Sequence, residues 1–595
     1  IIFDKTQQLY TQDMFTSPII EIAVSKSSAI IENCVFSEMV NTPVDSIMAI
    51  SADSISFSGC VLQGLKFYED NGCLALVSGA ITLQDTIFKS NQAELGQKRG
   101  GALIVLVNPI EGFTMEVSVQ NCSFEGNLGS LIAFENLMLN LNVNDTILED
   151  NCGLSAGLIH ITNAQETSLS FNETTFKHSK IVNEKCVYFD FLDIQSSNRT
   201  LNLAVNSSQL TVLGSFTGHL ITLQENFNII LDVSNFEFSP TGSSLSDTES
   251  HPSFGILNAD RFEGSFTNSK IQAMNFSNTQ LFKIKCVKQN NELFFGHLAV
   301  KDCSFTDIRL KTAVIFYMAS ENLDASDACD LKLEIDNTTF TNIQSTSTSS
   351  NGLIIVAGSS SNFAGLNQNA TFVSVSHSSF NTLSSTTGSV YYGLPLYNGA
   401  KVIFENNTFH GIVASQGGGV IHLASTPLLS SEVFSTSRLL TENEVNQEIT
   451  VTNCNFSEIS AQSGGVFYTN YSSSLTMITF DNNTFQQISV SERGGVIFVN
   501  DAQLTVTNNA FSSTKAGVSG ALIYLTKNNL VFAQNQVDDA DATLPIAYAL
   551  NSLNLSFDPP DFGKIEELNP LSSGNPTFMI TDIKTFSLQD YYLIV

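Results

Sequence analysis

Residues 449–456 read ITVTNCNF, in which apolar Ile449 and Val451 alternate with polar residues ahead of Asn453 and Phe456. Alternation with a period of two indicates a β-strand with one buried face. The same order recurs along most of the chain: apolar, any, apolar, any, Asn or Asp, any, any, Phe. Other clear copies begin at Val117, Leu333, Val402, Ile478 and Leu504. With degenerate copies included there are about seventeen, so one unit repeats through the chain.

The fifth position of the repeat forms a polar column. Asp occupies it in three copies, and Asn occupies it in nine, at Asn33, Asn121, Asn235, Asn268, Asn337, Asn406, Asn453, Asn482 and Asn508. The parity of an unbroken strand puts this column on the same face as the apolar residues before it, so we expect it to point inward. Stacked Asn side chains there would satisfy the turn backbone. The Phe three residues later is predicted to form an internal aromatic stack.

The spacing of the copies indicates a solenoid. Several copies lie 26 residues apart, and a second short strand often follows paired small residues, as at Gly418-Gly419 and Gly494-Gly495. Short strands without a helical period make one coil per repeat. The fold is therefore predicted to be all-β, a right-handed single-stranded parallel β-helix (a pectin-lyase-like solenoid) of about seventeen rungs. We expect it to fill residues 1–557, with 558–595 as an irregular extension, a cap or the start of a continuing region.

The composition predicts a large, folded, acidic protein. Apolar residues make up 43% of the chain, Phe alone numbers 44, and the net charge is −31. Such a surface disfavours nucleic acid and anionic membranes, which bind through Lys and Arg patches. No run of 18 apolar residues is present, so no membrane span is expected in this chain. The chain starts at Ile1 without Met, and we expect the parent protein to continue beyond one or both ends.

Ten cysteines occur without a CxxC motif or a Cys/His cluster, so a zinc site is not indicated. Five of them directly follow the fifth position: Cys34, Cys60, Cys122, Cys303 and Cys454. Only Cys34 and Cys60 lie in successive rungs, so a disulfide between them and a pair of stacked thiols are both open. A disulfide would indicate an oxidising compartment.

Thirteen Asn-x-Ser/Thr sequons fall into two classes. Those of Asn121, Asn337, Asn406 and Asn482 lie in the column expected to point inward, so we predict that they carry no glycan. The other nine are candidate acceptors in a secreted protein, namely Asn144, Asn172, Asn198, Asn206, Asn275, Asn369, Asn455, Asn470 and Asn554.

The sequence contains no recognisable catalytic constellation. Acidic clusters at Asp324/Asp327/Asp330 and Asp538/Asp539/Asp541 lack the spacing of a calcium loop and a Lys or Arg at a matching position in a neighbouring rung. His160 and His422 occupy a position that other rungs fill with Tyr468 or Phe498, which favours packing. We therefore expect no enzymatic activity and no catalytic, cofactor-binding or metal-binding residues. Ca²⁺ binding is possible but unsupported, and N-linked glycans are the only expected attachments.

Two short motifs resemble the repeat of the polymorphic-outer-membrane-protein type, whose marks are Gly-Gly-Ala-Ile and Phe-x-x-Asn. Gly100-Gly101-Ala102-Leu103 is similar to the first, and Phe88-Lys-Ser-Asn91 and Phe124-Glu-Gly-Asn127 match the second. The similarity covers residues from about 20 to about 545, although later copies mostly lose the Asn, as at Phe456-Ser-Glu-Ile459. The style also resembles large surface β-helix proteins of protists such as ciliates. The resemblance implies a surface-exposed, adhesin-like rod.

The predicted function is that of an extracellular or cell-surface structural protein. We expect a rigid glycosylated rod that serves as a filament subunit, a surface-coat component or an adhesin stalk. Its partners would be other copies of itself or other surface proteins and glycans, and a rung edge left open would allow end-to-end pairing. The alternative is a polysaccharide-active lyase or hydrolase, or a carbohydrate-binding module. A row of exposed aromatic residues and carboxylates beside one groove would favour that alternative.

Overall fold

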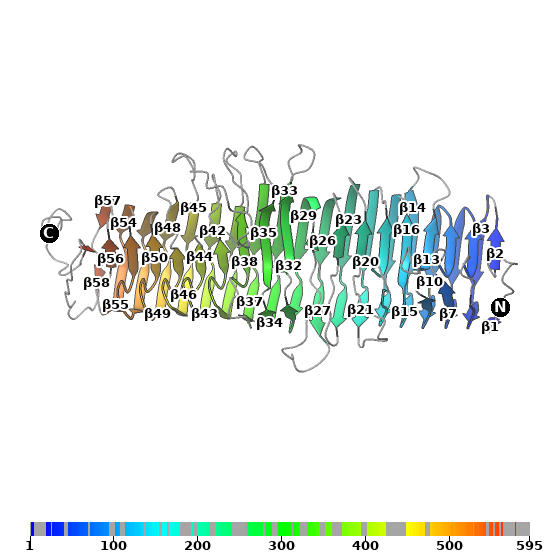
Figure 1. Ribbon diagram of the computed structural model, residues 1–595, viewed down its shortest axis with the longest axis horizontal. Helices are drawn as coiled ribbons and strands as arrows, with labels where there is room; N and C mark the ends of the chain where they lie inside the picture. The colour runs from blue at the N-terminus through cyan, green and yellow to red at the C-terminus, as the bar shows by residue number, and fades with distance from the viewer. Residues whose placement is uncertain are drawn as a thin grey trace, which may run out of the picture. The chain divides into compact units, whose positions relative to one another are not determined.

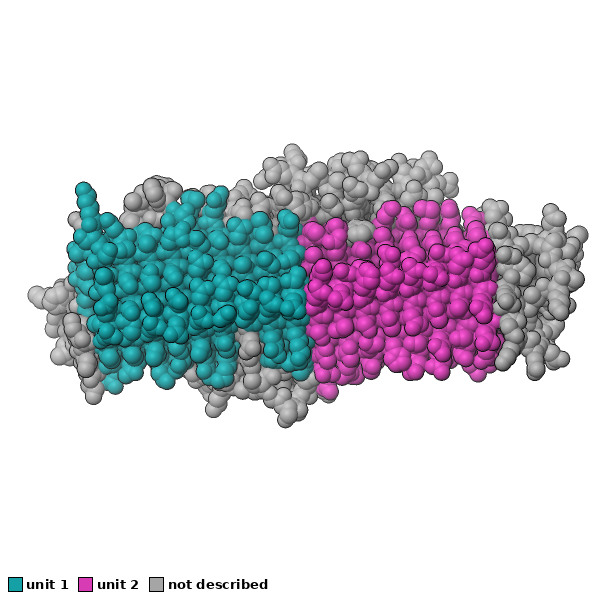
Figure 2. Space-filling view, turned by 180° about the vertical axis from the view of Figure 1, so that it is seen from behind, with its two compact units in different colours: residues 1–276 teal, residues 277–595 magenta. Residues whose placement is uncertain are grey.

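The computed structural model is a right-handed single-stranded parallel β-helix, as predicted, and its described residues form strands without any helix. These residues are 2–4, 20–24, 26–40, 46–68, 72–94, 102–107, 114–135, 138–153, 157–162, 166–178, 192–195, 199–212, 221–224, 227–240, 256–257, 259–277, 280–287, 295–311, 313–321, 330–345, 352–359, 372–393, 401–423, 448–469, 476–500, 502–526, 529–542, 547–550, 554–557, 561–562 and 577–578. The chain divides into two compact units, Ile1–Phe276 and Ser277–Val595, which Figure 2 colours separately.

Each rung contributes one strand to each of three parallel sheets. In unit 2, a representative rung runs through β42 (Lys401–Glu405) in the first sheet, β43 (Thr408–Ala414) in the second and β44 (Ile421–Leu423) in the third. These strands pair in parallel with β45 (Glu448–Thr452), β46 (Asn455–Ala461) and β47 (Phe467–Thr469) of the next rung, so that like positions of the repeat lie side by side. Figure 1 shows this stacking of strands within each unit.

Unit 1 has the following strands. The first sheet holds β3 (Ser28–Glu32), β6 (Ser54–Ser58), β10 (Ala80–Gln84), β14 (Thr114–Gln120), β17 (Met138–Asn144), β20 (Glu166–Asn172), β23 (Arg199–Asn206), β26 (Phe227–Ser234) and β29 (Ala259–Thr267). The second holds β1 (Ile2–Asp4), β4 (Val35–Ser37), β7 (Val61–Gln63), β11 (Ile87–Lys89), β15 (Ser123–Glu125), β18 (Ile147–Glu149), β21 (Thr175–His178), β24 (Gln209–Val212), β27 (Glu237–Pro240) and β30 (Lys270–Gln272). The third holds β2 (Ile20–Ala23), β5 (Met48–Ser51), β9 (Leu74–Val77), β13 (Ala102–Val107), β16 (Ser130–Glu135), β19 (Ile159–Thr162), β22 (Leu192–Gln195), β25 (Ile221–Gln224) and β28 (Ile256–Leu257). A further short pair is β8 (Lys66–Tyr68) with β12 (Gln92–Glu94). The strand β31 (Asn275–Ser277) ends at Ser277, the first residue of unit 2.

Unit 2 repeats the arrangement. Its first sheet holds β33 (Phe295–Lys301), β36 (Asp330–Asp336), β39 (Phe372–Ser376), β42, β45 (Glu448–Thr452), β48 (Met477–Asp481), β51 (Gln503–Thr507), β54 (Asn529–Ala533) and β57 (Asn554–Phe557). Its second holds β34 (Ser304–Lys311), β37 (Thr339–Ser345), β40 (Ser379–Ser385), β43, β46 (Asn455–Ala461), β49 (Thr484–Val490), β52 (Ala510–Ala516), β55 (Gln536–Ala542) and β58 (Asp561–Phe562). Its third holds β32 (Gln280–Val287), β35 (Val314–Glu321), β38 (Ile355–Ser359), β41 (Tyr391–Gly393), β44, β47 (Phe467–Thr469), β50 (Ile497–Asn500), β53 (Ile523–Thr526) and β56 (Ala547–Leu550), with β59 (Thr577–Phe578) antiparallel to β56.

The Phe column forms the predicted internal stack. In unit 2 the rings of Phe305, Phe340, Phe380, Phe409, Phe456, Phe485 and Phe511 lie face to face, with successive centroids 4.6 to 5.0 Å apart. Phe88 and Phe124 stack in the same way in unit 1, at 4.6 Å. Parallel in-register pairing places each ring directly over the next, at about the strand spacing of 4.8 Å.

The expectation that the fifth-position column points inward is wrong. All nine of its Asn residues, Asn33, Asn121, Asn235, Asn268, Asn337, Asn406, Asn453, Asn482 and Asn508, are exposed and have left-handed backbones, with φ from +46° to +57°. A left-handed residue turns the chain from the first sheet into the second and breaks the alternation of faces. Asn, Asp and Gly tolerate this conformation best, which accounts for the composition of the column.

The inward amide ladder lies one residue later, at the sixth position. Asn483 and Asn509 are each 1% exposed. Nδ2 of Asn483 donates to the carbonyl oxygen of Val451 at 2.9 Å and to Oδ1 of Asn509 at 3.0 Å, and the backbone N–H of Asn483 donates to that same Oδ1. Asn509 repeats these contacts with Asn535. The ladder therefore satisfies backbone groups that the buried turn leaves unpaired.

A second amide ladder in unit 1 uses the Asn of the Phe-x-x-Asn motif at Asn91 and Asn127, and continues to Asn151, which follows Leu148 at the same spacing. Asn91, Asn127 and Asn151 are buried. Asn91 Nδ2 donates to Asn127 Oδ1 at 2.9 Å, and Asn127 Nδ2 donates to Asn151 Oδ1 at 2.7 Å. The Asn of this ladder thus occupies the second turn of a rung, as the sixth-position Asn occupies the first turn.

The paired glycines allow rungs to approach closely where the third sheet begins. Gly494 has a left-handed φ of +63°, and a Cβ on Gly495 would lie 1.9 Å from the carbonyl oxygen of Ala521 in the next rung. A side chain at Gly495 would therefore push two backbones apart.

The neighbouring residues Asn508 and Asn509 separate the two turn positions experimentally. Asn509→Ala leaves buried hydrogen-bond donors and acceptors in two rungs without partners. It should therefore lower the free energy of unfolding by roughly 2–4 kcal/mol. Asn508→Gly preserves the left-handed turn and should change it by less than about 0.5 kcal/mol. Urea unfolding of both variants and the parent measures the difference. Equal destabilisation by the two changes would contradict the burial of Asn509.

Candidate functional site

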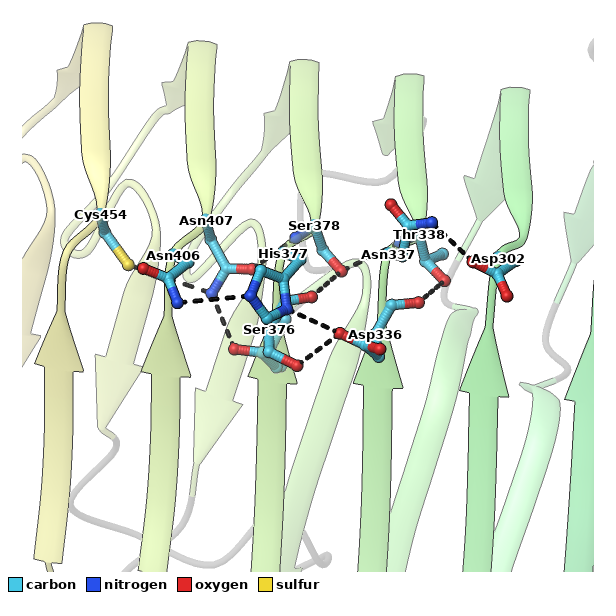
Figure 3. Close-up of polar contacts among 11 residues, drawn as sticks. Asp302, Asp336, Asn337, Thr338, Ser376, His377, Ser378, Asn406, Asn407 and Cys454 are labelled. Carbon is cyan, nitrogen blue, oxygen red and sulfur yellow. Dashed lines mark hydrogen bonds and ion pairs between the residues drawn. The ribbon is translucent and has the colours of Figure 1, made fainter.

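A row of polar side chains lies where β36, β39 and β42 end in unit 2, as Figure 3 shows. Nδ1 of His377 lies 2.9 Å from Oδ1 of Asp336, and the Ser376 hydroxyl donates to the same oxygen at 2.8 Å. On its other side, Nε2 of His377 lies 3.4 Å from Nδ2 of Asn406. These contacts fit an imidazole that carries its proton on Nδ1 and accepts weakly from Asn406 at Nε2.

A second histidine–carboxylate pair lies on the outer face of the same sheet. Nε2 of His297 on β33 lies 3.3 Å from Oε2 of Glu334 on β36, and Nζ of Lys332 contacts the other oxygen of Glu334. Glu334 and Asp336 share one strand face, so their side chains emerge about 7 Å apart. The two pairs thus place proton donors and acceptors close together on this sheet.

Neighbouring groups lower the pKa of both carboxylates. For Asp336 the hydrogen bond from His377 is the largest cause, and it outweighs partial burial, which raises the pKa. For Glu334 burial raises the pKa, but the hydrogen bonds and charges of Lys332 and His297 together lower it. Both carboxylates are therefore held ionised at neutral pH.

The two pairs remain open to solvent. The side chains of His377 and Asp336 are 61% and 39% exposed, and those of His297 and Glu334 are 31% and 40% exposed. Water screens electrostatic interactions at such exposure, so these histidine–carboxylate pairs contribute little to stability. Within the described residues, no group of three or more His, Cys, Asp or Glu side chains could hold a metal ion.

Sequence reasoning missed the pair of His377 and Asp336. The signal was present, because His377 occupies the fifth position of its copy and Asp336 the fourth position of the preceding copy. Parallel pairing of β36 with β39 brings Asp336 opposite Ser376, next to His377.

The acidic clusters are arranged differently from the prediction. Asp538, Asp539 and Asp541 are exposed, but Lys515 does occupy the matching position in the neighbouring rung, with its Nζ 3.1 Å from Oδ2 of Asp541. The expectation that no basic residue matches this cluster is therefore wrong. Asp324 and Asp327 lie outside the described residues, and the side chain of Asp330 is not described.

The candidate glycan acceptors differ in exposure. Asn206 and Asn455 are exposed, and Asn144 and Asn172 are half-buried. Asn275 is only 2% exposed, and this burial counts against its prediction as an acceptor. Asn198, Asn369 and Asn470 lie outside the described residues, and the side chain of Asn554 is not described.

The cysteines of the sixth position are buried thiols. Cys34 and Cys60 are both free, so the structure contains two stacked thiols and not the candidate disulfide. Burial is the largest cause of the raised pKa of Cys60, and it raises the pKa of Cys454 to about 12. Cys152, in contrast, is disulfide-bonded.

His422 belongs to a stacked row of rings on the outer side of the third sheet of unit 2. Its ring centroid lies 5.1 Å from that of Tyr392 and 4.9 Å from that of Tyr468. Its Nδ1 donates to the carbonyl oxygen of Gly417 at 2.9 Å. Stacking occupies the faces of these rings, so the row offers no open aromatic platform for a sugar. The expectation that His422 is a packing residue is consistent with these contacts.

The comparisons with known proteins assign no family. No family model and no curated protein matches the chain. A solved structure of the PL6-family alginate lyase AlyGC is similar at 9% identity, with a TM-score of 0.20, over 91% of this chain and 97% of that chain. The expectation of no enzymatic activity is corrected here, because the matched structure is that of an enzyme. At this TM-score the likeness assigns no activity to the chain.

No helix of the described residues has the length and apolar character needed to cross a bilayer.

Acidification is expected to destabilise the fold through His422. Burial lowers the pKa of His422 in the folded state, so below about pH 6.5 the unfolded chain binds a proton that the folded chain excludes. The melting temperature should fall between about pH 7.5 and about pH 5.5, and His422→Tyr, which copies Tyr468 of the next rung, should reduce that fall. Thermal melting of both proteins at both pH values measures this. An unchanged pH response in the variant would contradict the assignment.

Proposed function

We propose that the protein is a secreted or cell-surface structural protein, a rigid, glycosylated β-helical scaffold. The supporting observation is the structural role of each recurring position in the repeat. Its recurring positions serve interior stacking, as in the Phe and Asn ladders, or left-handed turns, as in the fifth-position column. Such a repeat stabilises length and stiffness and leaves the surface free to vary.

The surface is suited to solvent and to glycans. The chain carries a net charge of −31, which favours solubility and disfavours anionic partners. Exposed sequon residues such as Asn206 and Asn455 offer attachment points. We propose that the partners are further copies of the chain or other extracellular proteins and glycans.

The location of the native protein tests this proposal. Intact cells treated with protease should lose the protein, and glycopeptide mass spectrometry of the native material should find N-glycans on it. An intracellular, protease-protected and sugar-free protein would contradict the proposal.

A second candidate is acid–base chemistry on a carbohydrate, which the His377–Asp336 and His297–Glu334 pairs favour. Lys332, in contact with Glu334, adds a positive charge that could hold an acidic sugar. Incubation of the purified protein with a panel of polysaccharides, followed by assay of newly formed chain ends, tests it. Cleavage that is lost in both His377→Asn and Glu334→Gln would support this candidate, and the absence of cleavage by the parent protein would remove it.

A further inference from the structure

We infer that the sequon asparagines in the left-handed turns are N-glycan acceptors and that three of them line one edge of unit 2. The three are Asn337, Asn406 and Asn482, and Asn121 is their counterpart in unit 1. This reverses the prediction that these four residues carry no glycan, which assumed an inward column. The inference rests on the proposed function, since glycosylation requires passage through a secretory pathway.

In the three sequons of unit 2, the left-handed turn directs both essential residues outward. Asn337 and Thr339 are exposed, whereas Thr338 between them is fully buried. The same order of exposed, buried and exposed holds at residues 406–408 and 482–484. The middle residue anchors the turn in the core, and the acceptor amide and the hydroxyl residue stand in solvent.

The hydrogen bonding of the acceptors is compatible with a glycan. Nδ2 of Asn337 donates one hydrogen to Oδ1 of Asp302 at 2.6 Å, and Nδ2 of Asn482 donates one to Oδ1 of Asn453 at 2.7 Å. In the transfer, Nδ2 loses one proton and bonds to the anomeric carbon of a lipid-pyrophosphate-linked oligosaccharide, and the lipid pyrophosphate leaves. The amide keeps its second N–H, so the bond to the preceding rung can persist.

The acceptors recur every second rung. In the fifth-position column of unit 2, His377 separates Asn337 from Asn406, and Asn453 separates Asn406 from Asn482. At the spacing of parallel strands, successive acceptors lie about 10 Å apart. The glycans would therefore form a row along this edge, and the first two would stand on either side of His377 and cover the His377–Asp336 pair.

The buried sequon of Asn275 serves as an internal negative control for the exposed sequons. Asn275 is 2% exposed and Phe276 is fully buried, so a glycan there would disrupt the core. Asn453 provides a second contrast, because it has the same turn and the same exposure but no sequon.

Secretion of the full chain from eukaryotic cells, behind a heterologous signal peptide, tests the inference. Enzymatic release of the glycans in heavy-oxygen water converts each occupied Asn to isotopically labelled Asp, which peptide mass spectrometry detects. Label is expected at Asn121, Asn337, Asn406 and Asn482, and none at Asn275. Occupancy of Asn455 together with unlabelled left-handed-turn sites would overturn the inference.

Two variants keep the test independent of folding defects. Thr408→Ala removes the Asn406 sequon without touching the left-handed residue, and should lower the mass of the secreted protein by one glycan. Asn453→Gly alters an equivalent turn without a sequon and should leave the number of glycans unchanged. A glycan count that Thr408→Ala does not reduce would overturn the inference at Asn406. An intracellular, sugar-free native protein alongside labelled recombinant sites would contradict the proposed function and leave the acceptor geometry intact.

Discussion

The left-handed residue between the first and second sheets is the constraint on which the rest of each rung depends. A parallel β-helix must turn its chain sharply once per strand while keeping the backbone of the turn in register with the rungs on both sides. The described turns do this with φ near +50° at the fifth position and hydrogen bonds to the equivalent turn of the next rung, as from Asn453 N to Asp481 O. The turn places the fourth and fifth positions outside the core and returns the sixth position to the core.

That return explains why the sixth position in the described rungs of unit 2 holds Asn, Ser, Thr or Cys. Thr338, Ser378, Asn407, Cys454, Asn483 and Asn509 are all buried there. The turn leaves backbone groups that only a side chain can satisfy, and a buried unsatisfied group costs about 1–3 kcal/mol. Asn satisfies more of them than Ser, Thr or Cys, because its amide donates and accepts at once. The Phe stack adds buried apolar surface. The sixth-position hydrogen bonds and the Phe stack together stabilise only one register of the rungs.

Much of this fold was predictable from the sequence, because period-two alternation and a fixed repeat determine strand, coil and stacking. The Phe stack followed from spacing alone. The direction of the Asn column did not, because parity counts assume a continuous strand, and one left-handed residue shifts every later side chain by one position. The frequency of Asn, Asp and Gly at that position did indicate a left-handed turn, since those residues tolerate positive φ. The pair of Asp336 and His377 required knowledge of which strands are neighbours, and Lys515 opposite Asp541 was missed for the same reason.

The same turn geometry links the fold to the proposed function, since it presents Asn side chains at regular intervals on the surface. The most direct test of that geometry compares adjacent residues on the two sides of the core boundary. Asn453→Cys would create a thiol at the left-handed position, beside the native thiol of Cys454. Reaction of the native, folded protein with a maleimide, followed by peptide mass spectrometry, should label residue 453 rapidly and leave Cys454 unmodified until the protein is unfolded. Rapid labelling of Cys454 with protection of residue 453 would show that the column points inward and would contradict this account of the rung.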